Sequence, residues 1–418
     1  MKEIITDLII AAGLAGIALG RIPRLKMNRA TIALFFAIML IAAGSISLDE
    51  AGSAIDLGAI ALLFAMMIII ANLRLSGFFS AASARIVSLA RSPRGLLALV
   101  VFVSGFFAAF FLNDTVCVML TPLVIEMTLR AKRDPLPYLI GLATAANVGS
   151  CATIIGNPQN MLIGAASGIP FGEFMLKLAP PSIAGLFAVW LIILLVYPKE
   201  FAAGSTIEPA QMGLDAPAAP KAHINRPLLV WSLAATVLML VLLFCGVKSS
   251  LAALIGAALL LPNCIVSADD VFAGVDFSVL VFFCGLFIIT GTIEKTGAFG
   301  WCVQKATPYL GSGTGAGPLA FFSGLTLLFS NLISNVPTVM LFRPFVSLFR
   351  DAEKAWLVLA LASTYAGNLT LLGSVANLIV AESARSRGIR LSFGAYLKAG
   401  LPITLITAVL GTVWLILI

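Results

Sequence analysis

The amino-acid sequence predicts an all-α polytopic membrane protein made of two inverted repeats. Of its 418 residues, 60% are hydrophobic and only 11% are charged, whereas a soluble protein carries about 25% charged residues. Long apolar runs recur along the whole chain, which is typical of membrane-spanning helices. Two stretches far apart in the sequence interrupt such runs with similar polar residues. Because the basic residues lie in short loops between the spans, we interpret the net charge of +7 as a sign of membrane orientation and not of a nucleic-acid partner.

The apolar segments can be assigned at about 20 residues per crossing. They are 4–20, 30–47, 56–73, 96–131, 137–167 and 174–197 in the first half, and 227–246, 249–266, 276–293, 314–349, 355–384 and 394–417 in the second. The segments 96–131 and 314–349 are too long for one crossing and too short for two, and each has polar residues at its centre. Each is expected to form a re-entrant helical hairpin whose tip is buried in protein near the membrane middle.

Basic residues in the short loops predict the orientation of the chain. They follow the first span, the third span and the first hairpin, and they precede the last span: Arg21, Arg24, Lys26, Arg29, Arg74, Arg85, Arg91, Arg94, Arg130, Lys132, Arg133, Arg385, Arg387 and Arg390. The positive-inside rule places these loops in the cytoplasm and leaves the acidic loop 49–56 outside. Each half then has five crossings plus a hairpin, and this odd count inverts the second half. Both termini are expected on the external, periplasmic face of the cell inner membrane.

Residue numbers support the internal repeat. Asn335 and Pro344 follow Asn113 and Pro122 at one offset, 222 residues. Further matches in the same order join Ser76-Gly77 to Thr296-Gly297, Gly156 and Asn160 to Gly373 and Asn377, and Phe171-Gly172 to Phe393-Gly394. We therefore expect an N-terminal repeat at 1–197 and a C-terminal repeat at 227–418. Between them, 198–226 is rich in Ala, Pro, Gly and acidic residues, which predicts a flexible cytoplasmic linker.

Interrupted hydrophobic segments at matching positions of two halves indicate the midplane binding site of a transporter. The hairpin tips contain 113–115 (Asn-Asp-Thr) and 334–336 (Ser-Asn-Val), and the interruptions are 156–160 (Gly-Asn-Pro-Gln-Asn) and 373–377 (Gly-Ser-Val-Ala-Asn). Helix N-termini at such breaks attract anions and free carbonyls coordinate cations. The alternative is a pair of structural kinks satisfied by neighbouring helices. The predicted substrate-binding residues are Asn113, Thr115, Asn157, Gln159, Asn160, Asn335, Thr338, Ser374 and Asn377.

Asp114 is the predicted carrier of the coupling charge. A carboxylate near the bilayer middle is costly unless it is paired, hydrated or protonated, so it marks function. Its counterpart in the second half is Val336, so any charge role belongs to one half. The alternative is that Asp114 caps the second helix of its hairpin. Together with Asn113, Gly156 and Gly373 it forms the predicted ion-coupling set, for H⁺ or Na⁺.

Other classes of protein are poorly supported by the residues. The single histidine, His223, lies in the hydrophilic linker, and the six cysteines are scattered singly. Neither a metal site nor His-based catalysis is therefore expected, and we predict that the protein is not an enzyme. No phosphate-loop motif is present, so ATP hydrolysis is not encoded in this chain. No cofactor is expected.

Arg343 should lie about 12 Å from its hairpin tip, where it either snorkels to the interface or lines an anion path.

The interrupted segments resemble the ion transporter superfamily, which includes arsenite efflux permeases, the melanosomal P protein, sodium/proton antiporters and sodium-coupled dicarboxylate carriers. Residues 112–114 (Leu-Asn-Asp) and 120–122 (Leu-Thr-Pro) are similar to the hairpin of the arsenite permease branch, and 335–339 to its second-half counterpart. Residues 373–377 are similar to a segment shared by the P protein and bacterial anion permeases. The resemblance covers essentially the whole chain.

This resemblance implies a scaffold part and a transport part that holds both hairpins, commonly in a homodimer, and it allows a separate soluble ATPase subunit. It implies secondary active transport of a small inorganic or organic anion or solute across the lipid bilayer, with arsenite or antimonite efflux as the best-named candidate. The alternatives are a Na⁺- or H⁺-coupled carrier of dicarboxylates or other anions, and a Na⁺/H⁺ antiporter. The family's dicarboxylate carriers use Ser-Asn-Thr at both tips, and the charge of Asp114 argues against that branch. A channel is the alternative from another class.

Overall fold

All the regular secondary structure in the part of the chain that the structure describes is helical. The computed structural model describes residues 2–20, 26–79, 81–82, 92–202, 224–262, 265–310 and 316–418, without the side chains of 298–303. Among the helices in the described residues, seven are long and apolar enough to cross a membrane. The prediction of an all-α polytopic membrane protein is therefore confirmed. The inverted relation of the two repeats stays a prediction, and most of the predicted linker, including His223, lies outside the described residues.

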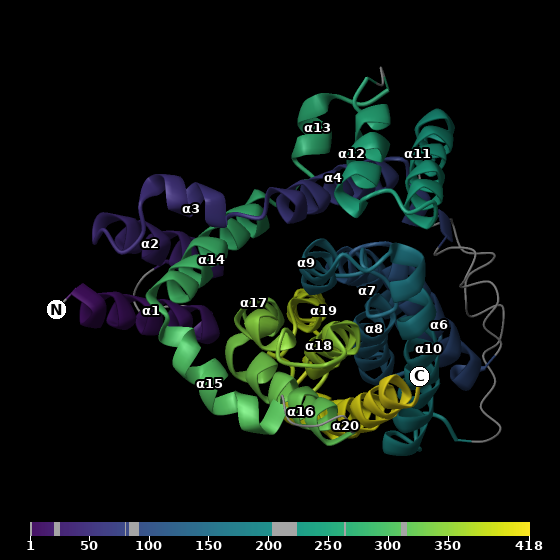
Figure 1. Cartoon of the computed structure of the whole chain (residues 1–418). Coiled ribbons are helices and arrows are strands. Elements are labelled where there is room, and N and C mark those ends of the chain that lie inside the picture. Colours follow the sequence, from purple (N-terminus) through teal and green to yellow (C-terminus); the bar gives the residue numbers. More distant parts are fainter. Residues whose placement is uncertain are drawn as a thin grey trace.

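Helices from both halves of the chain form a peripheral group (Figure 1). In this view α1–α3, α14 and α15 lie on the left, and α4 and α11–α13 lie along the top. Their bounds are α1 (Lys2–Leu19), α2 (Arg29–Ala42), α3 (Leu48–Ala54), α4 (Leu57–Leu75), α11 (Arg226–Phe244), α12 (Ser249–Leu260), α13 (Ala268–Phe272), α14 (Phe277–Thr296) and α15 (Ala298–Leu310). The peripheral group thus takes its helices from the beginning of each predicted repeat.

The remaining helices form a core group beside this arc, again with members from both halves (Figure 1). They are α6 (Pro93–Phe110), α7 (Asn113–Arg130), α8 (Pro135–Ser150), α9 (Pro158–Ser167), α10 (Phe171–Val196), α16 (Ala316–Ile333), α17 (Asn335–Val346), α18 (Ala352–Ala366), α19 (Val375–Arg385) and α20 (Phe393–Leu417). Helices α8 and α18 are buried along nearly their whole length. The core group therefore encloses the segments that carry the predicted site.

The two long apolar segments each fold into two helices that meet at the predicted tip. Helix α6 ends at Phe110 and α7 begins at Asn113, and α16 is followed directly by α17 at Ser334. Ser334 has a φ of 86°, which is uncommon for a residue other than glycine. The predicted helical hairpins are thus present, with their polar residues at the start of the second helix.

The two Gly-containing interruptions also break helices as expected. Helix α8 ends before 151–157, and α9 then begins with Asn157 as its cap, whose side chain accepts a hydrogen bond from Asn160 N. Helix α18 ends before 367–374, and Ser374 caps α19 by accepting a hydrogen bond from Ala376 N. Asn and Ser are preferred at such caps because their side-chain oxygens satisfy backbone N–H groups that have no partner in the helix.

Three short or marginal helices, α3, α13 and α15, fall in segments that the hydropathy pattern leaves as loops. Helix α3 is built on a capping box, in which Ser47 Oγ accepts from Glu50 N and the Glu50 carboxylate accepts from Ser47 N. This Ser-x-x-Glu spacing is a helix-start signal that hydropathy alone does not register.

A close helix crossing holds the first hairpin against α8. A Cβ atom added to Gly149 would lie 2.1 Å from the carbonyl oxygen of Gly105 on α6. Two glycines facing each other let helix backbones approach closely, as is common in membrane proteins. This contact places the end of α8, and the break that follows it, beside the first hairpin.

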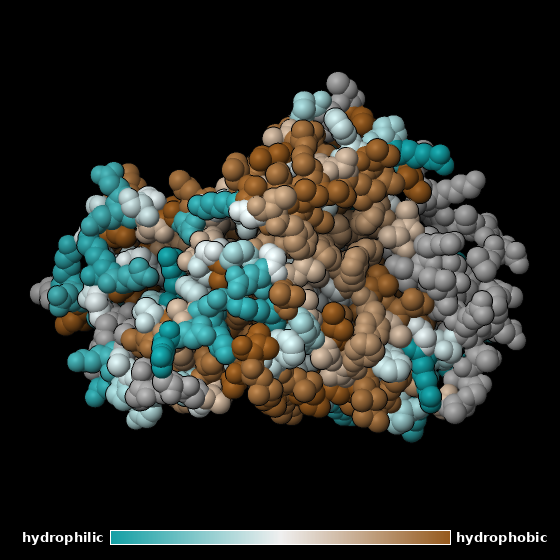
Figure 2. All heavy atoms as spheres, turned by 45° about the vertical axis from the view of Figure 1, so that its right-hand side comes forward, coloured by the Kyte–Doolittle hydropathy of each residue, from teal (hydrophilic) through white to brown (hydrophobic). Residues whose placement is uncertain are grey.

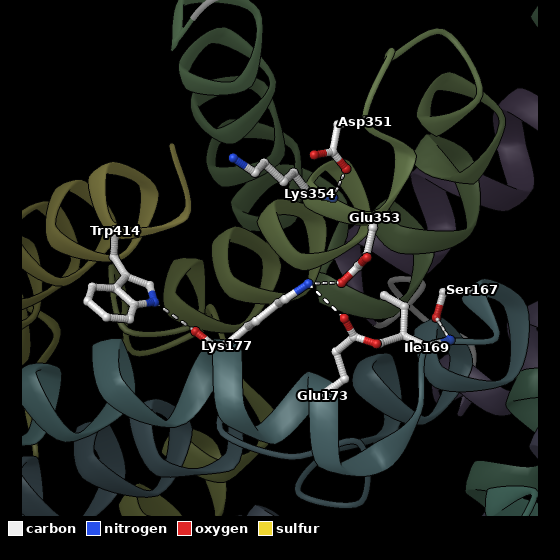
Figure 3. Close-up of polar contacts among 8 residues, drawn as sticks. All are labelled: Ser167, Ile169, Glu173, Lys177, Asp351, Glu353, Lys354 and Trp414. Atoms are coloured by element: carbon white, nitrogen blue, oxygen red, sulfur yellow. Dashed lines mark hydrogen bonds and ion pairs between the residues drawn. The ribbon is translucent and has the colours of Figure 1, made fainter. Parts of the chain in front are cut away.

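Contacts at one end of the molecule join segments that are predicted to be external. Lys177 of α10 binds both Glu173 and Glu353, and the indole of Trp414 donates to the carbonyl oxygen of Lys177 (Figure 3). Lys295 of α14 binds Glu50 of α3 at 2.6 Å. These ion pairs connect the starts of α10 and α18 in the core group, and α3 with α14 in the peripheral group.

Contacts at the opposite end join segments that are predicted to be cytoplasmic. The Tyr197 hydroxyl donates to the carbonyl oxygen of Ala395 at 2.9 Å, and Asn225 N donates to Ser76 O at 3.1 Å. The grouping of the ends therefore agrees with the loop charges. Which end faces the cytoplasm stays a prediction of the positive-inside rule.

The surface is largely apolar, as expected for lipid contact. Figure 2 shows hydrophobic side chains across the upper, central and lower parts of this face, while hydrophilic side chains gather mainly on its left and centre left. Large exposed hydrophobic residues occur on α10, α11 and α20, for example Phe187, Trp231 and Leu405. Such helices need lipid or protein to cover them, which is consistent with a multi-pass membrane protein.

Candidate functional site

Asn147 of α8 is the centre of a buried hydrogen-bonded network that joins both halves of the chain. Its side-chain oxygen accepts from Asn113 Nδ2 at 3.0 Å and from Ser374 Oγ at 3.1 Å. Its amide nitrogen donates to Asn368 Oδ1 at 2.9 Å and to Asn377 Oδ1 at 3.1 Å. One side chain therefore connects the tip of the first hairpin with the second helix break, and all of these side chains are buried.

A second group of polar side chains lies at the first helix break. Asn157 Nδ2 donates to Ser150 Oγ at 2.8 Å and to Thr364 Oγ1 at 3.3 Å. Gln159 Nε2 donates to the same threonine oxygen at 3.2 Å. Thr364 belongs to α18 of the second half, so this break is also bound across the two halves.

Asn160 and Asn377, which occupy matching positions, brace their own breaks. Asn160 Nδ2 donates to the carbonyl oxygens of Ser150, Cys151 and Thr153. Asn377 Nδ2 donates to the carbonyl oxygens of Gly367 and Thr370 at 2.7 and 3.1 Å. These carbonyls are left without helical partners where α8 and α18 end. Both asparagines thus stabilise the interrupted backbone, whatever they also contribute to a substrate.

The matching glycines of the breaks are close-packed. A Cβ atom on Gly156 would lie 2.3 Å from Ser150 O, and its own carbonyl oxygen accepts from Asn113 N at 3.1 Å. A Cβ atom on Gly373 would lie 3.0 Å from Gly367 O and 3.1 Å from Asn331 Oδ1. Each predicted ion-coupling glycine therefore lets a hairpin tip reach its helix break.

The second hairpin tip presents acceptor atoms that lack partners. Asn335 is 8% exposed, and its side-chain oxygen and that of Asn331 have no hydrogen-bond partner among the described residues. Thr338 is fully buried, and its hydroxyl donates to Ser334 O in the preceding turn. Of the two predicted substrate residues on this tip, Asn335 is thus the one with an unused polar atom.

Asp114 lies in the first turn of α7 and is only partly buried, as is Thr115. No hydrogen bond or ion pair to its carboxylate occurs within the described part of the chain, and α7 has no side-chain cap. The capping alternative is therefore not supported by the geometry. A carboxylate at a helix N-terminus is favoured by the helix dipole, and this one is free to exchange a proton or contact a cation.

Several of the predicted site residues from the first and the second half of the chain come together in the structure. Asn113, Ser374 and Asn377 meet in the Asn147 network, and Asn157 and Gln159 meet at Thr364. The sequence interpretation missed Asn147, Thr364 and Asn368 as site residues. A signal for Asn147 existed, because it is a polar residue inside a predicted span, one turn before α8 ends at Ser150.

The chemistry of this region is that of amides and hydroxyls. The nine predicted substrate residues and their hydrogen-bond partners include Asn, Gln, Ser and Thr side chains and backbone carbonyls. Among all the predicted site residues, substrate-binding and ion-coupling together, Asp114 is the one with an ionisable side chain. No basic side chain belongs to this set, and Arg343 is exposed at the far end of its helix. Amide and hydroxyl groups of this kind can form hydrogen bonds with a small polar solute, but they offer no counter-charge to a polyanion.

Comparisons with known proteins agree with the fold and with transport. The family model described as "Citrate transporter" (CitMHS) matches residues 14–366. The silicon efflux transporter LSI3 of Oryza sativa subsp. japonica is 34% identical over 453 residues, covering 93% of both chains. An uncharacterized transporter of Mycobacterium tuberculosis is 29% identical over 443 residues, covering 99% of this chain and 98% of the other. The crystal structure of the Alcanivorax borkumensis YdaH transporter has a TM-score of 0.58 at 15% identity, covering 100% and 98%, which shows a shared fold.

Proposed function

This chain belongs to the citrate transporter family, and we propose that it is a secondary active transporter that exports a small inorganic hydroxide. Arsenite or antimonite is the best candidate substrate, moved by alternating access and coupled to an H⁺ or Na⁺ gradient. The observation that carries the proposal is the Asn147 network, in which neutral amides and the Ser374 hydroxyl converge from both halves of the chain. Asp114 follows Asn113 of this network in the chain, and its backbone N–H donates to the Asn113 side chain.

The neutral lining supports an uncharged substrate. Arsenous and antimonous acids are uncharged hydroxides near neutral pH, and their O–H groups can donate to amide oxygens and accept from amide N–H groups. A citrate or dicarboxylate ion would instead have to leave water without a basic partner, which is costly for a buried charge. The rice relative is a silicon efflux transporter, which supports efflux of a small inorganic solute.

Asp114 is the proposed coupling residue. Because its carboxylate is partly buried and makes no hydrogen bond or ion pair in the described part of the structure, a proton or a Na⁺ ion could bind it in one state of the cycle. Gly156 and Gly373, with Asn113, would shape the backbone around that ion. Asp114→Asn should abolish gradient-driven transport while leaving expression and folding intact, and unchanged coupled transport would exclude this role.

The second candidate is a carrier of citrate or another carboxylate, which the description of the family favours. A Na⁺/H⁺ antiporter of the same fold is a further alternative. Purified protein in liposomes with an imposed pH or Na⁺ gradient separates the three, with arsenite, citrate and Na⁺ as the solutes measured. Gradient-driven arsenite flux without citrate flux supports the proposal, whereas citrate flux alone would refute it. The homodimer, the soluble ATPase subunit, the inner membrane and the external termini stay predictions.

A further inference from the structure

Two adjacent cavities lie between the peripheral group and the core group, away from the amide network. The larger has a volume of about 500 Å³ and the smaller about 390 Å³. The larger is walled by α3 and α14 on the peripheral side and by α9, α17 and α18 on the core side. We call the two cavities together the vestibule.

The vestibule follows two helices that start at the candidate site. On α17, Val339 and Arg343 line it, and they lie four and eight residues after Asn335, on one face of the helix. On α9, Leu162 and Ala166 line it, and α9 begins beside Gln159. The vestibule therefore extends from about 6 to about 12 Å along α17 from the second hairpin tip, and both helices lead from it toward the site.

Two residues of opposite charge face the junction of the two cavities. Glu294 of α14 and Arg343 of α17 line both cavities, together with Ala166 and Trp356. Both charged side chains are exposed, and neither forms an ion pair in the described part of the chain. The neighbouring Lys295, in contrast, is already bound to Glu50 within the peripheral group.

We propose that Glu294 and Arg343 form the gate of this vestibule, pairing when the core group moves toward the peripheral group. This inference rests on the proposed transport function. Glu294 belongs to one group and Arg343 to the other, so an ion pair between them would tie the two walls together across the junction. The pair would occupy the junction of the cavities and block the path along α17. In the present structure this ion pair is not formed among the described residues, as the proposal requires of the open state at this end.

The lining of the larger cavity also restricts what passes the open gate. It contains four carboxylates, those of Asp49, Glu50, Asp56 and Glu294, but only two basic side chains, Lys295 and Arg343. The net charge of −2 attracts cations and repels polyanions. Uncharged hydroxides and a coupling H⁺ or Na⁺ are therefore the solute classes that this vestibule admits.

A charge exchange tests the gate. Glu294→Arg and Arg343→Glu should each lower arsenite flux in liposomes by about fivefold, because like charges at the junction replace a pair worth up to about 1 kcal/mol. The double exchange should restore the flux to within about twofold of wild type. Asp49→Arg is the control, because Asp49 lines the larger cavity but not the junction. A double exchange no better than the single exchanges would overturn the proposal.

A disulfide trap tests the same gate without measuring transport. In a background with all six native cysteines replaced, Glu294→Cys with Arg343→Cys should lose maleimide labelling on oxidation and regain it on reduction. The control pair is Asp49→Cys with Arg343→Cys, which should stay labelled. If wild type moves no arsenite but the trap closes, the proposed substrate is wrong and the gate stands. If the trap never closes, or the control pair closes equally, the gate is wrong.

Discussion

Asn147→Ala is the sharpest test of the candidate site. The substitution removes four buried side-chain hydrogen bonds at once, to Asn113, Ser374, Asn368 and Asn377. Side-chain hydrogen bonds in membrane proteins average about 0.6 kcal/mol each, which gives about 2.4 kcal/mol for four. Because the side-chain oxygens of Asn368 and Asn377 would then be left buried without a partner, the expected loss in unfolding free energy is about 2–5 kcal/mol.

The loss can be measured by denaturant or thermal unfolding in detergent micelles, with transport followed in parallel. Asn147→Asp is the informative second variant, since it keeps the acceptor for Asn113 and Ser374 but replaces the donor to the other two side chains. Thr144→Val on the same helix is the control, because the Thr144 hydroxyl bonds only to its own helix at Ile140 O and Gly141 O. It should cost less than about 1 kcal/mol. Equal unfolding of Asn147→Ala and Thr144→Val would refute the central position of Asn147.

Three further predictions follow from individual contacts. Gly149→Ala should strongly destabilise the protein, because its new Cβ would lie 2.1 Å from a backbone oxygen of α6. Glu50→Gln should lower the melting temperature at pH 7, because its hydrogen bonds to Lys295 and the cap of α3 hold the pKa of Glu50 at about 2. That contribution is fully present above the usual carboxylate pKa and is lost as pH falls toward 2, so the difference from wild type should shrink with acidification. Lys177→Met should cost no more than about 1 kcal/mol, because its two ion pairs are partly exposed.

Each of these has a matched control. Gly317→Ala should be tolerated, because a Cβ atom there would meet nothing within 4 Å. Asp49→Asn, next to Glu50 in the same turn, should not reproduce the pH-dependent melting of Glu50→Gln. Lys354→Met should be neutral, because the Lys354 side chain forms no ion pair or hydrogen bond within the described residues, and only its backbone N–H donates to Asp351 Oδ1 (Figure 3). A melting temperature for Gly149→Ala equal to that of Gly317→Ala would contradict the close crossing. An effect of Glu50→Gln on the melting temperature that does not change with pH would contradict the Glu50 prediction. A loss of unfolding free energy well above about 1 kcal/mol in Lys177→Met would contradict the Lys177 prediction.

The positions of the helices in this protein were determined by the hydropathy of the sequence and by the Gly and polar residues that interrupt its apolar runs. The apolar runs predicted the spans, and the polar centres of 96–131 and 314–349 predicted two hairpins, because a buried helix turn needs polar groups to satisfy its free backbone atoms. Gly156 and Gly373 marked the broken helices for the same local reason. These features depend on residues that are close together in the chain, so the local sequence was enough to predict them. Short capped helices such as α3 were missed because they bury too little apolar surface to alter hydropathy.

Only the tertiary structure decided what each polar side chain does. Asn147 stands out in the sequence only as a polar residue inside a predicted span, and its partners are not local, since two of them lie 221 and 230 residues away. Asn160 and Asn377 were predicted as substrate residues, but the packing of the breaks uses their amide nitrogens to hold backbone carbonyls. Asp114 could have been a helix cap, and its free carboxylate is a property of the folded hairpin. Hydrogen-bond partners are chosen by which helices meet, and that choice is made by packing across the whole chain.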